Sequence, residues 1–257
     1  MNLTDRTYIV TGAAGGIGEG ITRAILDQGG QVALVDLRAE AAARVAAKVD
    51  PDRSRTLAIA GDVVSETDAV SAVEATVGHF GRLDGLVNNA GVVTLDTAWD
   101  ATPQIWEREL SVNVTGSFVM AQAVGRHLRK HRGGAIVNVA SNCGKVGYKN
   151  MAAYNASKAA VINLTRSLAL EWAPDGINVN AVCPGGVDTP MLAGVAEWLA
   201  PRLDLPAADI LAGMGPGQLG RKIQPVEVGK VIAFLLSDDA LIIRGQAINV
   251  DGGDTPY

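Results

Sequence analysis

Short apolar runs alternate along the chain with longer stretches in which apolar residues recur every three or four positions. The short runs contain β-branched residues and little polar alternation, which is typical of strands buried on both faces of a parallel sheet. Seven such runs occupy residues 8–10, 32–35, 57–60, 83–87, 135–139, 177–182 and 247–250. The helical pattern is clearest over residues 17–28, 38–49, 66–80 and 152–173.

This alternation predicts an α/β fold with a doubly wound, mainly parallel seven-stranded sheet of the Rossmann type and right-handed crossovers. No repeat, low-complexity tract or linker interrupts the pattern, so we expect residues 1–257 to form a single domain. Residues 189–220 differ, because they hold four prolines and several glycines. We expect them to form a mobile substrate-binding segment outside the sheet, with two short helices.

Composition narrows the classes of partner. The chain is 48% hydrophobic and 19% charged, which supports a large core and argues against disorder. Its net charge of −5 comes without a basic stripe, so no nucleic-acid partner is expected. We find neither a signal peptide nor an apolar run long enough to cross a membrane, the longest wholly apolar run being residues 231–236. Two distant cysteines, Cys143 and Cys183, are typical of free thiols in a reducing compartment, so a cytoplasmic location is expected.

A glycine-rich turn directly follows the first apolar run and directly precedes the first helix. It contains Gly12, Gly15, Gly16 and Gly18, with Ile17 opening the helical pattern. Glycines allow a tight turn and a close approach of a pyrophosphate, which the free N–H groups of a helix N-terminus attract. The alternative is a simple tight turn between strand and helix. Its position in the first strand–helix unit favours dinucleotide binding.

An acidic residue ends the second strand. Asp36 lies twenty residues after Gly16, where a carboxylate accepts hydrogen bonds from the adenosine ribose and repels a 2′-phosphate. The next residue is Leu37 rather than a base, although Arg38 one position further on is able to meet a phosphate. Asp36 is also suited to cap the following helix. On balance the pattern favours NAD over NADP.

A tyrosine and a lysine four positions apart suggest acid/base chemistry. Tyr154 and Lys158 lie in the predicted helix 152–173 and therefore share one of its faces. A nearby ammonium favours the phenolate, so that the tyrosine can exchange a proton with an alcohol or a ketone. Ser141 follows the fifth strand, at the edge of the sheet where ligands bind, and its hydroxyl can hold the substrate oxygen. Alone, such a pair is more often a surface contact.

Together these motifs resemble the short-chain dehydrogenase/reductase family over nearly the whole chain. The motif residues that match are Thr11, Gly12, Gly16, Gly18, Asp62, Asn88, Asn89, Ala90, Gly91, Asn113, Ser141, Tyr154, Lys158, Pro184, Gly185, Gly186, Val187 and Thr189. The resemblance implies that Tyr154 is the general acid/base and that Lys158 lowers its pKa and binds the nicotinamide ribose. It further implies that Ser141 polarises the substrate oxygen and that Asn113 holds a water linking Lys158 to solvent.

The residues expected to contact NAD come from the motifs and from this resemblance. They are Gly12, Gly15, Gly16, Ile17, Gly18, Asp36, Leu37, Asp62, Val63, Asn89, Ala90, Gly91, Tyr154, Lys158, Pro184, Gly185, Val187 and Thr189. No metal is expected, because the hydride acceptor is the cofactor and Ser141 and Tyr154 handle the charge on oxygen.

The substrate is expected to be a small secondary alcohol or its ketone, and a polyol, sugar alcohol or diol in particular. The predicted pocket residues are Ser141, Asn142, Cys143, Asn150, Gly186, Met191 and Trp198. Packing of the segment is an equal explanation for Met191 and Trp198. A 3-oxoacyl-thioester reductase, a dehydrogenase of bulky alicyclic or steroid alcohols, and a non-catalytic NAD-binding regulator remain alternatives. Relatives of this kind imply a homotetramer formed through the helix 152–173 and the last strand.

Overall fold

The computed structural model describes residues 2–131 and 133–256 of the chain. Seven strands form one sheet in the order β3-β2-β1-β4-β5-β6-β7, and all pairings between them are parallel. The strands are β1 (Thr7–Thr11), β2 (Gln31–Asp36), β3 (Thr56–Ala60), β4 (Gly85–Asn88), β5 (Gly134–Val139), β6 (Ile177–Pro184) and β7 (Ala247–Val250). The predicted doubly wound Rossmann-like fold is confirmed, and each predicted strand ends within two residues of the observed one.

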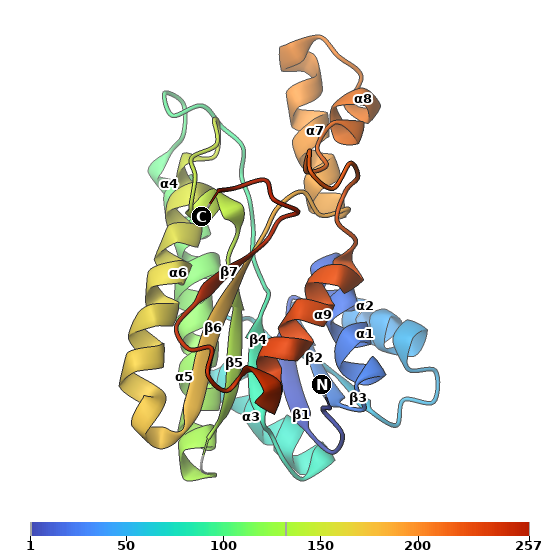
Figure 1. The fold of residues 1–257 in the computed structure, drawn as a ribbon, viewed down its shortest axis with the longest axis vertical. Helices are drawn as coiled ribbons and strands as arrows, with labels where there is room; N and C mark the ends of the chain where they lie inside the picture. Colours follow the sequence, from blue (N-terminus) through green and yellow to red (C-terminus); the bar gives the residue numbers. More distant parts are fainter. Residues whose placement is uncertain (1, 132, 257) are drawn as a thin grey trace.

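Helices cover both faces of this sheet (Figure 1). One face carries α1 (Ile17–Asp27), α2 (Ala39–Val49) and α9 (Pro225–Leu236), and the other carries α3 (Glu66–Phe80), α5 (Gly116–Lys130) and α6 (Ala152–Trp172). Each layer encloses its own cluster of buried apolar side chains, so strand residues are covered on both sides. This explains why the strands read as apolar runs instead of alternating patterns.

The pair α1 and α9 packs backbone against backbone through two glycines. A Cβ on Gly20 would lie 2.3 Å from the backbone of Pro225, and a Cβ on Gly229 would lie 2.4 Å from the carbonyl oxygen of Gly20. The helix at residues 225–236 was not predicted from the sequence, where only the apolar run at residues 231–236 was noted. The close approach fixes α1, whose N-terminus faces the site described below.

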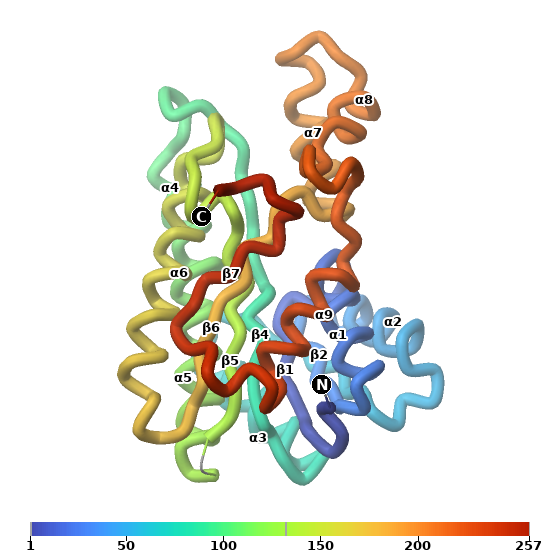
Figure 2. Tube along the Cα trace, in the orientation of Figure 1, coloured from blue at the N-terminus to red at the C-terminus, as the bar shows by residue number. Residues whose placement is uncertain are grey.

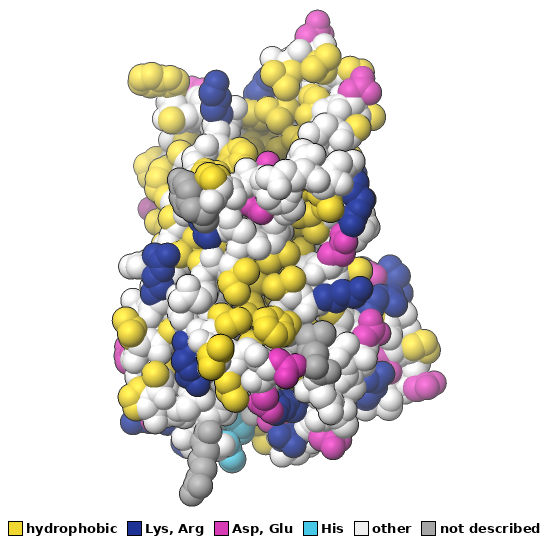
Figure 3. Space-filling model, in the orientation of Figure 1, with side chains coloured by type: hydrophobic (Ala, Val, Ile, Leu, Met, Phe, Trp, Pro, Cys, Tyr) yellow, Lys and Arg dark blue, Asp and Glu magenta, His cyan; other side chains and the backbone are white. Residues whose placement is uncertain are grey.

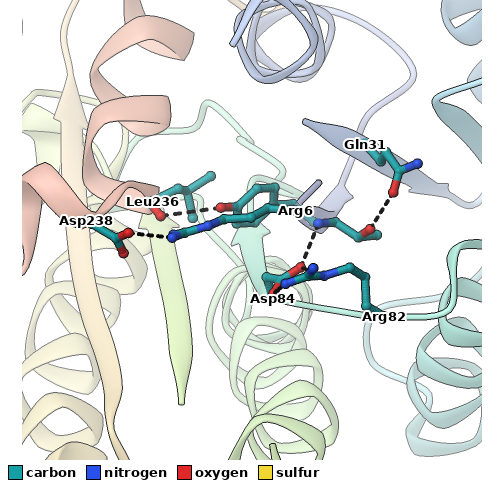
Figure 4. Close-up of polar contacts among 8 residues, drawn as sticks. Arg6, Gln31, Arg82, Asp84, Leu236 and Asp238 are labelled. Carbon is teal, nitrogen blue, oxygen red and sulfur yellow. Dashed lines mark hydrogen bonds and ion pairs between the residues drawn. The ribbon is translucent and has the colours of Figure 1, made fainter. Parts of the chain in front are cut away.

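Polar side chains join the strands at the opposite, amino-terminal edge of the sheet (Figure 4). Asp84 accepts hydrogen bonds from the backbone N–H of Thr7 (2.8 Å) and from the Arg82 guanidinium (2.6 and 2.8 Å). Arg6 pairs with Asp238, beyond the end of α9. These contacts join β1, the start of β4 and the end of α9 at the amino-terminal edge of the sheet, away from the carboxyl edge where ligands are expected.

The segment 189–220 projects beyond the carboxyl edge of the sheet as two helices, α7 (Pro190–Leu203) and α8 (Ala207–Ala212) (Figure 1). The remaining elements are α4 (Pro103–Leu110), a π-helical turn (Ser111–Thr115) and 3₁₀ turns at Asn142–Gly144, Ala173–Asp175 and Asp238–Ala240. Within the described residues, no helix is both long and apolar enough to traverse a bilayer.

Candidate active site

A cavity of about 690 Å³ lies at the carboxyl edge of the sheet, between the ends of the strands and α7. Figure 3 shows hydrophobic side chains in a hollow beside α7 and α8. The expected cofactor and substrate residues that line the cavity are Gly12, Gly15, Gly16, Ile17, Asp36, Asn89, Ala90, Gly91, Ser141, Asn142, Cys143, Tyr154, Lys158, Pro184, Gly185, Gly186, Val187, Thr189 and Met191. Residues far apart in the sequence therefore share one wall.

The glycine-rich turn forms a cradle that side chains would fill. Gly12 and Gly16 have φ angles of +60° and +54°, a region that favours glycine. A Cβ on Gly12 would lie 2.7 Å from the Cα of Ala90, whereas one on Gly15 would meet no atom within 4 Å. No side chain caps the N-terminus of α1, so its N–H groups face the cavity without a side-chain acceptor. The turn thus fits a pyrophosphate.

Asp36 lines the cavity beside the glycine-rich turn. Its two carboxylate oxygens accept hydrogen bonds from the backbone N–H groups of Ala14 (3.1 Å) and Arg38 (3.3 Å). The carboxylate is therefore held beside the glycine turn, and Arg38 also lines the cavity. Leu37, by contrast, is exposed and lies outside the wall.

Asn89 joins the end of β4 to the glycine turn. Its side-chain amide donates to the carbonyl oxygens of Thr11 (3.0 Å) and Gly12 (2.9 Å). The neighbouring Asn88 is buried, and its amide donates to Ser117 O (2.8 Å) and Asn138 Oδ1 (2.9 Å). These bonds explain why the expected asparagine segment supports the sheet and flanks the cavity at the same time.

The predicted Tyr154–Lys158 pair lies on one face of α6. Lys158 is buried, its Nζ donates a hydrogen bond of 2.9 Å to the carbonyl oxygen of Val139, and it lies 5.6 Å from the centroid of the Tyr154 ring. Val139 is the last residue of β5, so this bond anchors α6 to the strand that precedes Ser141. Ser141 accepts a hydrogen bond from the backbone N–H of Cys143 (3.1 Å). All three proposed catalytic side chains line the cavity.

Asn113 lies behind this wall, in the π-helical turn between α4 and α5. Its Oδ1 accepts from the Val92 N–H (2.8 Å), and its Nδ2 contacts Val92 O (3.0 Å) and Ser157 Oγ (2.9 Å). Gly91 separates it from the lysine, because a Cβ there would lie 3.3 Å from Asn113 Oδ1 and 3.4 Å from Lys158 Nζ. Asn113 is thus next to Lys158 but not part of the cavity wall, and the water it is expected to hold remains a prediction.

Comparison with known proteins agrees with this geometry. A model of the short-chain dehydrogenase/reductase family, described as enoyl-(acyl carrier protein) reductase, matches residues 12–255. The D-threitol dehydrogenase of Mycolicibacterium smegmatis is 39% identical over 255 residues, which are 99% of this chain and 95% of the relative. The NAD-dependent glycerol dehydrogenase of Listeria innocua is 37% identical over 255 residues, 99% of this chain and 96% of the relative.

A solved structure is similar over the same length. A variant of the actinorhodin polyketide ketoreductase with NADPH has a TM-score of 0.93 and 32% identity, covering 99% of this chain and 100% of that one. The chain belongs to the short-chain dehydrogenase/reductase family. This short-chain dehydrogenase/reductase is an oxidoreductase that acts on CH–OH groups, which sets aside the non-catalytic alternative.

Burial acts on the two ionisable groups of the enzyme in opposite directions. It lowers the pKa of Lys158 to about 8, with Cys143 and Glu109 opposing, so the amine is mainly charged at pH 7. It raises the pKa of Tyr154, and the hydrogen bond with Ser141 opposes this only in part. The net direction for Tyr154 is opposite to the expected lowering, because desolvation of the phenolate outweighs the other effects. The tyrosine is therefore a proton donor at rest.

Several expected contacts lie away from the cavity. Gly18, Leu37, Asp62, Val63, Asn150 and Trp198 do not belong to the wall formed by the described residues. Val63 is buried against α5, where a Cβ on Gly116 would approach its Cγ2 to 2.6 Å. Asp62 instead accepts from the Val64 N–H (3.1 Å). Their contacts with a cofactor or substrate remain predictions.

Two of the expected substrate contacts, Asn150 and Trp198, have other partners in this structure. Trp198 lines a neighbouring hollow and its ring stacks on the Arg202 guanidinium, 3.5 Å from the ring centroid, one turn further along α7. Asn150 has a φ of +63°, and its carbonyl oxygen accepts from the Asp96 N–H (3.0 Å). Asn150 thus serves the loop before α4 rather than the pocket.

Glu109, a fully buried carboxylate behind Asn113, was not predicted from the sequence as part of the site. It accepts hydrogen bonds from the Thr94 N–H and from Asn113 Nδ2 (3.3 Å). Burial raises the pKa of Glu109, while the Thr94 bond and the charge of Lys158 lower it. The only signal in the sequence is its place four residues before Asn113, which puts both side chains on one helical face. We infer that Glu109 is a positioning residue for Asn113 and Lys158.

Replacing Glu109 by Gln should disturb both stability and the pH profile of the enzyme. A Gln amide would set a donor against Asn113 Nδ2, so the unfolding free energy should fall by about 1.5–3 kcal/mol. Because the carboxylate raises the pKa of Tyr154, its loss should also move the acid limb of the kcat profile for alcohol oxidation to lower pH. Urea unfolding and kcat against pH measure the two effects.

The matched control for this variant is Glu107→Gln, an exposed position on the same helix. It should change neither quantity. A Glu109→Gln enzyme that loses stability but keeps the wild-type pH profile would show that Glu109 has a purely structural role.

Proposed function

We propose that the enzyme transfers a hydride reversibly between NAD and the carbinol carbon of a small secondary alcohol, a polyol, sugar alcohol or diol in particular. The observation that carries this proposal is the common wall of Ser141, Tyr154 and Lys158 with the glycine cradle and Asp36. When bound, the nicotinamide supplies the hydride acceptor or donor. The chain itself must orient the alcohol, move its hydroxyl proton and exclude water.

The proton is handled by residues of α6 and of the turn after β5. Ser141 holds the substrate oxygen. In reduction the Tyr154 hydroxyl donates its proton to that oxygen; in oxidation the phenol first releases its proton to solvent, and the phenolate then takes the proton of the alcohol. The Lys158 ammonium, charged at neutral pH because its pKa is about 8, stabilises the phenolate that forms. Its bond to Val139 keeps the amine in place while the tyrosine changes charge.

Polar side chains next to Ser141 support a small, polar substrate. Asn142 and Tyr148 offer polar groups next to Ser141, and Met191 offers an apolar surface. The relatives that are named for D-threitol and glycerol support a polyol. Pro190, Met191 and Met214 bring residues 189–220 into the same wall, which supports their proposed role as the mobile substrate-binding segment of a single domain.

Preference for NAD is supported by the position of Asp36. Its carboxylate lies at the end of β2, in the cavity wall, where a 2′-phosphate would meet like charge. A 3-oxoacyl-thioester reductase using NADPH would need a cation in its place, and Arg38 is the only candidate that lines this part of the described wall. The glycerol dehydrogenase relative is named as NAD-dependent.

Asp36→Ala should reduce the preference of the enzyme for NAD over NADP. Removing the negative charge should lower the ratio of kcat/KM for NAD to that for NADP by about tenfold, since close like charges repel by a few kcal/mol at most near a surface. Steady-state kinetics with both cofactors measure the ratio. Asp52→Ala, an exposed aspartate in the loop before β3, should leave it unchanged. An unaltered ratio in Asp36→Ala would place the selectivity elsewhere.

We also propose a homotetramer in the cytoplasm. Leu170 on the outer face of α6 is 81% exposed and Ile242 before β7 is 94% exposed, which supports contacts of a second and third copy at both expected faces. Both cysteines are free thiols, as a reducing compartment requires. Sedimentation equilibrium tests the assembly, and the mass of a monomer would contradict it.

Tyr154→Phe tests the function most simply. The change removes the proton-exchanging hydroxyl and keeps the ring, so kcat for oxidation of a small diol with NAD should fall by about 10²–10⁴-fold. The dissociation constant for NAD should stay within a factor of about three, because the adenosine and pyrophosphate contacts remain. Reduced-nicotinamide absorbance and fluorescence titration measure these quantities. Turnover close to that of the wild type would exclude the proposed mechanism.

A further inference from the structure

Three polar side chains from separate parts of the chain meet on the substrate side of the cavity. The Nδ2 of Asn142 donates to the hydroxyl of Tyr148 (2.9 Å) and to Oδ2 of Asp254 (3.0 Å), and the Tyr148 hydroxyl lies 3.2 Å from the same oxygen. All three line the cavity together with Tyr154. The tail after β7 turns back toward the upper end of α6 to reach this point (Figure 2).

The tail that carries Asp254 is held in a defined turn. The buried Asp251 accepts hydrogen bonds from the N–H groups of Gly253 (3.1 Å) and Thr255 (2.9 Å), on both sides of Asp254. Gln218, which follows α8, donates to Gly253 O (2.9 Å). The carboxylate is therefore positioned by its backbone and not only by its partners in the cavity.

The cluster is directly connected to the proposed reaction site. Ser141 and Asn142 are consecutive residues, and the Ser141 hydroxyl donates to Asn142 Oδ1 (3.3 Å). A substrate oxygen held by Ser141 thus has Asn142, and beyond it Asp254, on one side. A substrate hydroxyl on the carbon next to the carbinol carbon would therefore lie on the side of Asn142 and Asp254.

The second oxygen of the exposed Asp254 carboxylate, Oδ1, is accessible to a substrate hydroxyl or to water. Both amide protons of Asn142 are used, by Tyr148 and by Asp254 Oδ2. Among the described residues, none donates a hydrogen bond to Asp254 Oδ1. An ionised carboxylate oxygen accepts hydroxyl protons in stronger bonds than neutral acceptors do, and it repels anions. Tyr148 remains a neutral phenol, because burial and Asp254 raise its pKa to about 12.

We propose that Asp254, held by Asn142 and Tyr148, is the acceptor for a second hydroxyl of the substrate and selects neutral vicinal diols and polyols over anionic hydroxy acids. This inference rests on the proposed function of the same cavity and deepens it. It assigns a specificity-determining role to a residue in the tail after β7.

The test compares alcohols that differ by one hydroxyl. Butane-2,3-diol and butan-2-ol are oxidised at equivalent carbons, so the ratio of their kcat/KM values, with saturating NAD, isolates recognition of the second hydroxyl. Asp254→Asn should lower kcat/KM for the diol about tenfold or more and leave butan-2-ol within about twofold, as expected for loss of a charge-assisted hydrogen bond. The anion 3-hydroxybutyrate should become a better substrate of the variant, since a like charge is removed.

Asp52→Asn in the loop before β3 is the charge-matched control, because Asp52 is exposed and lies outside the cavity wall. It should leave both alcohols unchanged. Asp254→Ala is the second variant, and thermal unfolding of both Asp254 variants identifies any loss of fold. Equal loss of activity on both alcohols in a folded variant, or an unchanged diol ratio, would overturn the role of Asp254. Failure of the wild type to oxidise either alcohol would instead overturn the proposed function.

Discussion

The hydrogen bond between the Lys158 amine and the carbonyl oxygen of Val139, 2.9 Å long, is the contact on which the active site depends. It joins α6 to the carboxyl end of β5, one residue before the chain turns toward Ser141. Tyr154 lies one helical turn from the lysine, so the same bond also sets where the phenol points. The hydrogen bond from Asn138 on β5 to Thr165 on α6 (2.9 Å) strengthens the same attachment further along the helix.

The same hydrogen bond holds the Lys158 amine in a buried position, where desolvation disfavours its charged form. Desolvation lowers the pKa of the lysine and raises that of the tyrosine, so the resting pair is an ammonium beside a phenol. Oxidation of an alcohol requires the less favourable state, a phenolate, which the ammonium stabilises when the tyrosine loses its proton. Glu109 and Asn113 lie behind the lysine, and the hydrogen bond between their side chains joins the π-helical turn to α4. The resting site therefore combines a protonated tyrosine with a buried cation.

Much of this arrangement follows from local sequence chemistry, and the rest does not. The strands, the glycine turn and the spacing of Tyr154 and Lys158 are visible because each depends on neighbouring residues and on one repeating geometry. The direction of Trp198 could not be predicted, because it depends on how α7 packs and on the stacking of its ring with Arg202. Glu109 and Asp254 were missed because a carboxylate in a helix or a tail looks solvated until its distant partners, Thr94 and Asn142, are known.

The measurement closest to the central claim is the ionisation of Tyr154 itself. Ultraviolet difference titration of phenolate, taken against Tyr154→Phe to remove the other tyrosines, gives its midpoint in the presence of saturating NAD. We predict that the midpoint of Tyr154 ionisation in the wild type lies about 1–3 pH units below that in Lys158→Met, because the Lys158 ammonium favours the phenolate. Equal midpoints in the two proteins would contradict it.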